Sequence, residues 1–260
     1  MLEILHVLLE QNANHGSIEV LFTVAEESGM HGAKHIKRSD FEAEFGFVFD
    51  CQASPGNYIV EAPGAVSFTA VVRGRSAHAA VSPEKGVHAI QIASKAIAAL
   101  KLGRWDHTGM LNIGTIQGGT AINVVPDHVK VTGETRNASE SKLRAQVEYI
   151  RAAFSKAASD DGGSVDLEFV EKYGGYQFTE DNPMIVAARA GIAAAGLDPT
   201  PLKYAGGSDA NVLNKNGIPV LNLGVGFKNA HSSQECIAIR DLVAAAEIGL
   251  KTVQAVAKRA

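Results

Sequence analysis

Cysteine is scarce in this chain of 260 residues, where only Cys51 and Cys236 occur. Two thiols are too few for a disulfide framework or a thiolate zinc site. Lys and Arg number 24 against 28 Asp and Glu, which leaves a net charge of −4, and no basic run is interleaved with aromatic residues. A nucleic-acid-binding protein would need such a basic surface, so this class of function is disfavoured.

Long apolar runs are missing as well, and no stretch of the sequence is apolar over the length needed to cross a bilayer. The first residues, MLEILHVLLEQNANHG, carry neither the basic region nor the small-residue cleavage site of a signal peptide. Their apolar residues recur at helical spacing, which predicts an amphipathic helix. We therefore expect a cytoplasmic protein that makes no membrane contact.

Three common catalytic motifs are absent. The segment GGTAIN, residues 118–123, lacks the GxxxxGK[ST] pattern of a phosphate-binding loop, and no GxSxG elbow is present. His31 and His35 are four residues apart but do not belong to an HExxH motif, which makes them weak candidates for a metal pair. Cys51 lacks the basic or helix-start setting of a reactive thiolate, so a core position is expected for it.

The two ends of the chain share one pattern, in which helix-period and strand-period segments alternate. A composition of 46% hydrophobic and 20% charged residues supports more than one core. Alternating helices and strands predict a mostly parallel sheet covered on both faces. The expected helices are 2–13, 29–38, 183–195, 209–216 and 240–258, and the expected strands are 18–25, 45–51, 201–204 and 218–225.

The middle of the chain has longer strands and the order β-α-β-β-α-β, which is typical of a ferredoxin-like unit. Glycine and proline at Ala62-Pro63-Gly64 and within Lys172–Tyr176 mark its boundaries. The sequence thus predicts one α/β domain formed by residues 1–62 and 176–260, with residues 63–175 inserted as a second, α+β domain. Its expected strands are 65–75, 110–118, 127–136 and 164–171, and its expected helices are 84–101 and 139–159.

Acidic residues and one histidine follow the strands of the predicted α/β domain. Glu26 and Glu27 follow strand 18–25, Asp50 ends the strand FGFVFD, and His231 follows strand 218–225. Ligands bind at the carboxyl ends of parallel strands, so these side chains are expected to converge. Carboxylates with a histidine suit zinc, manganese or cobalt, and of two adjacent glutamates one can bind the metal while the other acts as general base.

Structural interpretations of the same residues remain open at this point. A Glu-Glu pair is commonly a solvated turn, Asp50 could cap a turn, and His231 could be an ordinary surface residue. The glycines of Gly74–His78 and Gly118–Pro126 could be turns or bulges, whereas the loop Gly206–Asp209 follows the predicted strand near Tyr204 and adds a polar signal at the same strand ends.

Five stretches, in order along nearly the whole chain, resemble the aminoacylase and carboxypeptidase-type metallopeptidases, and within them the peptidase T-like branch. They are IEVLFTVAEESGMHGAKHI, FGFVFDCQASPG, SFTAVVRGRSAHAA, GTIQGGTAINVVPDHVKVTGETRN and GGSDANVLNKNGIPVLNLGVGFKNAHSSQE. The resemblance implies a three-layer zinc-exopeptidase catalytic domain, incomplete at its N-terminus, with an inserted lid and dimerisation domain. It further implies two divalent metal ions, a short peptide substrate and a homodimer formed through the inserted domain.

The resemblance also implies roles for individual residues. Glu26 would be the general base, and His78 would reach the active site of the other subunit to stabilise an oxyanion. The implied metal ligands are Glu27, Asp50 and His231, and the implied substrate contacts are Asn123, Arg136, Gly206, Gly207 and Ser208.

The sequence departs from the family pattern in two places. The family's His-x-Asp element and its metal-bridging aspartate, which precede the Glu-Glu strand, have no counterpart here, since neither His6 nor His15 is followed by aspartate two residues later. We therefore expect a C-terminal portion of the family enzyme, or a naturally short gene product, with weak metal binding and little or no activity. Ala205 stands where the peptidase T-like pattern resembles Arg-Gly-Gly, which favours a different substrate choice. N-acyl-amino-acid deacylation or carboxypeptidase action is an alternative to tripeptide aminopeptidase activity, because the same catalytic machinery cleaves all these amides. The absent ligands leave a non-catalytic dimerising remnant as a further alternative.

Overall fold

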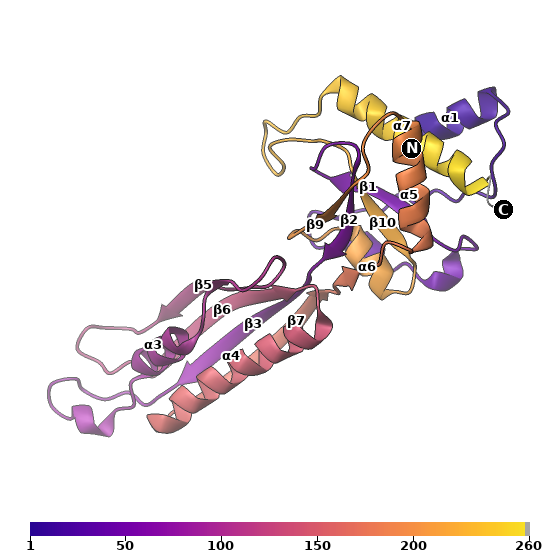
Figure 1. The fold of residues 1–260 in the computed structure, drawn as a ribbon. Helices are drawn as coiled ribbons and strands as arrows, with labels where there is room; N and C mark the ends of the chain where they lie inside the picture. The colour runs from indigo at the N-terminus through magenta and orange to yellow at the C-terminus, as the bar shows by residue number, and fades with distance from the viewer. Residues whose placement is uncertain (258–260) are drawn as a thin grey trace. The chain divides into compact units, whose positions relative to one another are not determined.

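The computed structural model describes residues 1–257 and divides the chain into two compact units (Figure 1). Unit 1 consists of Met1–Ala62 with Tyr176–Ala260, and unit 2 of Pro63–Gly175. Lys258, the last residue of the expected helix 240–258, lies outside the described residues. Within the described part of the chain, no helix is long and apolar enough to span a membrane.

Unit 1 is built on a mixed sheet of five strands. They are β1 (Gly46–Cys51), β2 (Asn57–Ala62), β8 (Tyr176–Gln177), β9 (Thr200–Lys203) and β10 (Val220–Gly224). β1 pairs in parallel with β10 and β2 in parallel with β9, whereas β2 is antiparallel to β10 and β8. The expectation of a mostly parallel sheet was wrong in part, because β2 was not predicted and runs against two of its neighbours.

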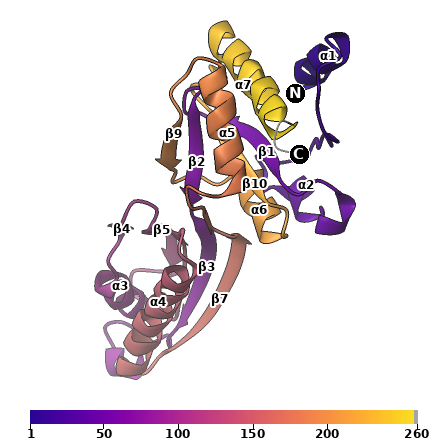
Figure 2. The same ribbon diagram turned by 45° about the vertical axis from the view of Figure 1, so that its right-hand side comes forward.

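Helices of unit 1 pack on this sheet and on each other. They are α1 (Leu2–Glu10), α2 (His31–Lys34), α5 (Pro183–Ala194), α6 (Asp209–Lys215) and α7 (Ile239–Ala257). Figure 2 shows α5 and α7 side by side, and the core between helices and sheet includes Tyr58, Ile185 and Leu221. The expected helix 29–38 is only the short α2 followed by a 3₁₀ turn, Arg38–Asp40.

The predicted strand 18–25 is not a strand in this structure, although Ile18–Ala25 is apolar. A β-ladder needs a neighbouring backbone, and within the described residues none pairs with this segment. The prediction of a strand there was therefore wrong for this chain.

Unit 2 is a five-stranded antiparallel sheet in the order β4-β5-β6-β3-β7, with α3 and α4 on one face (Figure 2). The strands are β3 (Gly64–Arg73), β4 (Gly103–Arg104), β5 (Met110–Gly118), β6 (His128–Asn137) and β7 (Ser164–Tyr173), and the helices are α3 (Ala89–Ala99) and α4 (Glu140–Asp160). The order of β3, α3, β5, β6, α4 and β7 and their pairing are those of the predicted ferredoxin-like unit. A core of Phe68, Ile92, Ile150 and Phe154 lies between the helices and the sheet.

Gly191 lets α5 approach α7 closely. A Cβ at this position would lie 2.7 Å from both the Cα and the backbone nitrogen of Thr252, so Gly191→Ala forces a backbone to move. Alanine would gain about 1 kcal/mol from its higher helix propensity, but overpacking costs more. We expect the free energy of unfolding to fall by about 2 kcal/mol, as measured by thermal denaturation. Gly249→Ala is the matched control, because its Cβ would first meet the flexible end of the Ile4 side chain. An equal or larger loss in the control would contradict the explanation.

Asp106 stabilises a turn of unit 2, and its ionisation makes that contribution dependent on pH. Burial alone would raise the pKa of Asp106, but hydrogen bonds from Lys142 and from the N–H groups of Gly109 and Thr108 outweigh it and bring the pKa down from 3.8 to about 2. A depressed folded-state pKa means that the contribution is present above pH 3.8 and is lost as the pH falls towards 2. The carboxyl is about a third exposed, so solvent screening limits the effect to about 1 kcal/mol.

The test of this turn is the Asp106→Asn variant. Its stability should fall less steeply than that of the unaltered protein between pH 4 and pH 2, as followed by urea denaturation at each pH. Parallel curves for the two proteins over this interval would show that Asp106 makes no such contribution.

Candidate metal and substrate site

Glu26 and Glu27 lie in a tight turn between residues 18–24 and α2. The N–H groups of Gly29 and Met30 donate to the Glu26 carbonyl at 2.9 and 2.7 Å. Ala25 and Met30, on either side of the turn, have positive φ angles of 56° and 58°, which non-glycine residues seldom adopt. The turn is therefore a specific conformation that places two carboxylates side by side.

Glu27 contacts His231, which comes from the far end of the sequence. Oε2 of Glu27 lies 2.9 Å from Nδ1 of His231, and both side chains are largely exposed, at 69% and 73%. The His231 loop has positive φ angles at Asn229 and His231, and the His231 N–H donates to the Glu235 carboxylate at 3.1 Å. Two of the residues predicted to bind one metal are thus in direct contact.

Glu26 and Asp50 lie within electrostatic range of each other and of other carboxylates. Burial, together with the negative charges of Asp50, Glu27 and Asp209, raises the pKa of Glu26 to about 7, and His231 partly offsets this. Burial is also the main cause that raises the pKa of Asp50, followed by the charges of Glu27 and Asp209. A concentration of carboxylates whose pKa values are raised is typical of a functional site that binds a cation.

Asp209 belongs to this cluster, and no role was predicted for it beyond its place in the polar loop Gly206–Asp209. It begins α6, and the Thr23 hydroxyl donates to its Oδ2 at 2.5 Å. Its Oδ1 is buried and has no hydrogen-bond partner among the described residues. Ser208 and Asp209 have the sequence pattern of an ordinary helix start. This pattern does not indicate the contact between Asp209 and Thr23.

Asn222 holds the strand ends of the site together. Its side chain accepts from the Asp50 N–H at 3.1 Å and donates to the Asp50 carbonyl at 2.8 Å and to the Ser208 hydroxyl at 3.1 Å. Ser208, at the N-cap of α6, is 5% exposed. The predicted substrate contact Ser208 is thus engaged in holding its own loop, while Gly206 and Gly207 beside it are half-buried.

In unit 2 the structure brings His78 and Asn123 together. The Ala79 N–H donates to the Asn123 carbonyl at 3.0 Å, and His78 forms an antiparallel bridge with Val124. The N–H groups of Ala80 and Val81 both donate to Nδ1 of His78 at 3.2 Å. With Nδ1 as an acceptor, the neutral ring carries its proton on Nε2, which makes the exposed Nε2 a hydrogen-bond donor.

Arg136 lies away from His78 and Asn123. It sits opposite Ala65 at one end of the β3–β6 ladder, whereas the His78 segment adjoins the other end, where Arg73 is paired with His128. Eight residues of strand separate the two ends, roughly 27 Å. Arg136 donates to Glu134 at 3.0 Å within β6. The three contacts predicted in unit 2 therefore form two separate groups within this unit.

A surface concavity of unit 1 lies apart from the residues of this acidic cluster. It has a volume of about 340 Å³ and contains none of the predicted site residues, being lined by Lys34, His35, Ile36, Lys37, Arg38 and Asn216. Among the described residues, no three His, Cys, Asp or Glu side chains are arranged to hold a metal ion. Glu27 and His231 are both metal-ligand residue types and are in contact, but two side chains make up only part of a metal site.

The peptidase dimerisation domain of the M20 family matches residues 60–162. The crystal structure of aminopeptidase PepT from Bacillus cereus is 40% identical and superimposes with a TM-score of 0.95, covering 98% of this chain and 68% of that one. The chain belongs to the M20 peptidase family, in its peptidase T-like branch. The family predicted from the five sequence stretches is confirmed, and so is the mixed α/β fold with its inserted domain.

Other similar proteins and solved structures cover the same part of the chain. The YqjE protein of Bacillus subtilis is 41% identical over 258 residues, covering 99% of this chain and 70% of that protein. A tripeptidase from Staphylococcus aureus is 35% identical with a TM-score of 0.94. The YxeP protein of Bacillus subtilis, described as a dinuclear metal-binding M20 peptidase, is 19% identical and shares the fold. The chain spans about 60% of the peptidase T of Vibrio cholerae, with which it is 27% identical.

Proposed function

We propose that this chain provides part of the catalytic apparatus of a metal-dependent exopeptidase that hydrolyses short peptides in the manner of a tripeptide aminopeptidase. The observation that carries the proposal is the contact between Glu27 and His231 beside Glu26, whose pKa is raised to about 7. Similarity to a PepT aminopeptidase and to a tripeptidase supports the choice of substrate class.

In this proposal Glu27 and His231 hold one divalent metal ion and Asp50 contributes to a second. Zinc suits this donor set, with cobalt or manganese as alternatives. When bound, the ions polarise the scissile carbonyl and lower the pKa of bound water. Glu26 takes a proton from the attacking water and returns it to the leaving amine, a task that suits a carboxyl with a pKa near neutrality.

The inserted unit supplies a hydrogen-bond donor and a dimer interface in the same proposal. His78, whose Nε2 carries the proton, reaches the active site of the partner chain and donates there to the oxyanion that develops on the substrate carbonyl, and Asn123 lies next to His78 in the loop pair. Arg136, Gly206, Gly207 and Ser208 contact the substrate. Chains pair as homodimers through unit 2, in keeping with its match to a peptidase dimerisation domain.

The set of ligands in the described residues limits what this chain does alone. Glu27 and His231 give one metal two protein ligands and Asp50 gives the other one, whereas catalytic zinc usually has three. We therefore infer weak metal binding and little or no hydrolysis by the isolated chain.

The proposal is tested with two readouts on the purified chain. Zinc, cobalt or manganese titration should shift the imidazole NMR signals of His231 at millimolar metal, and Glu27→Gln should reduce the shift. Absence of any shift would overturn the metal assignment independently of activity. Any hydrolysis should be sensitive to chelators, favour tripeptides with a free N-terminus and be abolished by Glu26→Gln, while preference for N-acetyl amino acids would assign the deacylase alternative.

A non-catalytic dimerising protein is the second candidate, because the dimerisation domain is matched while the described ligands are few. Light scattering that shows a stable dimer, together with a melting temperature indifferent to divalent metals, would favour it. If the protein is a monomer at high concentration, both candidate functions are contradicted, because each pairs two chains through unit 2.

A further inference from the structure

A run of basic residues lines the surface concavity of unit 1. Residues 34–38, with the sequence KHIKR, carry four basic side chains in a chain whose net charge is −4. We call these residues the 34–38 loop. Together with Asn216 they line the concavity, whose volume of about 340 Å³ falls within the range of small-molecule sites. Positive charge is therefore gathered at a hollow surface that is large enough to hold a ligand.

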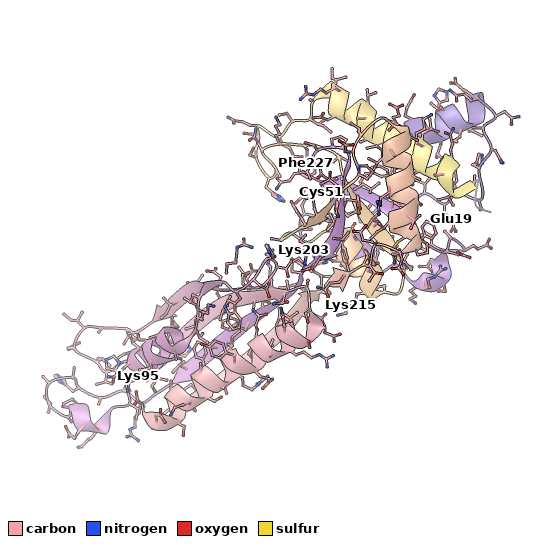
Figure 3. All side chains as sticks on the ribbon, in the orientation of Figure 1. Glu19, Cys51, Lys95, Lys203, Lys215 and Phe227 are labelled. Atoms are coloured by element: carbon pink, nitrogen blue, oxygen red, sulfur yellow. The ribbon has the colours of Figure 1, made fainter. Side chains whose placement is uncertain are left out.

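Hydrogen bonds from the end of α6 hold the backbone of the 34–38 loop in place. Asn216 directly follows Lys215, the last residue of α6, which is labelled in Figure 3. The Asn216 Nδ2 donates to the carbonyl oxygens of Ala33 and Ile36 at 3.3 and 2.8 Å. One side chain thus fixes the backbone at two points of the loop. A loop whose shape is set before a ligand arrives loses less conformational entropy when the ligand binds.

The cations of the loop have no carboxylate partner. In the part of the chain that the structure describes, no ion pair involves Lys34, Lys37 or Arg38. Arg38 donates from Nη1 to the Phe41 carbonyl at 2.8 Å, which holds its guanidinium beside the loop. Asp40, the nearest acidic residue in the sequence, accepts instead from the Lys37 N–H at 2.8 Å. Positive charges that line one concavity repel one another, and a bound anion offsets this repulsion.

We propose that the concavity lined by the 34–38 loop binds a small anion that carries phosphate groups. Phosphate oxygens bear more than one negative charge and accept several hydrogen bonds, which suits the guanidinium of Arg38 with the ammonium groups of Lys34 and Lys37. His35 adds a ring nitrogen at the same surface. None of the lining residues belongs to the acidic cluster, so this site does not rest on the proposed peptidase function.

The test is a titration of the purified chain with inorganic pyrophosphate at constant ionic strength, with EDTA present so that no metal ion mediates binding. We expect the backbone amide resonances of residues 34–38 to shift and saturate, with a dissociation constant below about 1 mM. Acetate, with its single charge, should leave them nearly unchanged. Shifts that do not saturate, or that acetate reproduces, would overturn the proposal. Binding to vesicles of anionic phospholipid without a response to pyrophosphate would identify a membrane surface as the partner and would overturn it as well.

Charge-reversal variants test which cations hold the anion. Lys34→Glu combined with Lys37→Glu should weaken pyrophosphate binding by about tenfold or more, while the melting temperature changes little because both side chains are exposed. Lys130→Glu combined with Lys172→Glu is the matched control, since it makes the same change in net charge at exposed lysines of unit 2. The control should bind pyrophosphate as the unaltered chain does. An equal loss in both double variants would attribute binding to the overall charge of the chain and would contradict the proposed site.

Discussion

Phe154→Ala should destabilise unit 2 by about 3–5 kcal/mol, the range for a fully buried phenylalanine. Phe154 has no exposed surface, and its ring lies 6.3 Å from that of Phe68, which packs in turn on Phe169. Removing it leaves a cavity between α4 and the sheet. Since small domains are stable by only about 5–15 kcal/mol, the variant should lie close to the limit of folding.

Trp105 provides the measurement, because it is the sole tryptophan of the chain and packs at the edge of the same core. Urea unfolding followed by its fluorescence should give the predicted loss for Phe154→Ala. Ile116→Ala serves as the control, since Ile116 is 51% exposed, and should cost less than about 1 kcal/mol. A loss of this smaller size for Phe154→Ala would show that the core is not packed as described.

Asn222→Leu should lower the free energy of unfolding of unit 1 by about 3 kcal/mol and should also displace Asp50. The substitution keeps the number and branching of the side-chain heavy atoms but leaves the Asp50 N–H, the Asp50 carbonyl and the Ser208 hydroxyl without this partner, and each buried unsatisfied group costs about 1–3 kcal/mol. Because Asp50 lies next to the last residue of β1, at the acidic cluster, its backbone amide resonance should shift with the loss of stability.

Asn214→Leu separates positioning from stability. Asn214 also makes three hydrogen bonds, to the Ala210 carbonyl and to the backbone of Val220, but none to Asp50. It should lower the stability of unit 1 while leaving the Asp50 amide resonance in place. If both variants moved that resonance equally, Asn222 would have no special role in holding the site.

Hydrophobic periodicity was sufficient to predict most helices and strands, because the faces that it marks are buried. It failed for residues 18–25, where the pattern is that of a strand but no neighbouring strand is present among the described residues. It also missed β2, a six-residue strand that follows Pro55 and Gly56 and is close to the predicted domain boundary. Pairing between segments is a tertiary property that one segment's pattern does not contain.

Part of the candidate site could be predicted from the sequence, because acidic residues and a histidine follow segments with strand periodicity. Glu27 and His231 were expected to meet because each follows a segment predicted as a strand, and they are in contact, although residues 18–25 form no strand in the structure. The role of Asn222 could not be predicted in the same way, because Asn222 lies inside the strand VLNLG and not at its end. A polar side chain in a buried apolar strand is nevertheless a signal, since it needs hydrogen-bond partners there. The positive φ angles at Ala25 and His231, which aim these loops, are set by tertiary contacts and leave no mark in the sequence.

The zinc content of the chain tests most directly the claim that this M20 chain holds part of a metal site. The purified protein would be equilibrated with zinc, freed of excess metal and analysed for zinc per chain. Our account predicts a value near zero, because Glu27, His231 and Asp50 leave each ion below the usual number of protein ligands. A value near two would contradict it and would show that this chain completes the site with ligands that we have not identified.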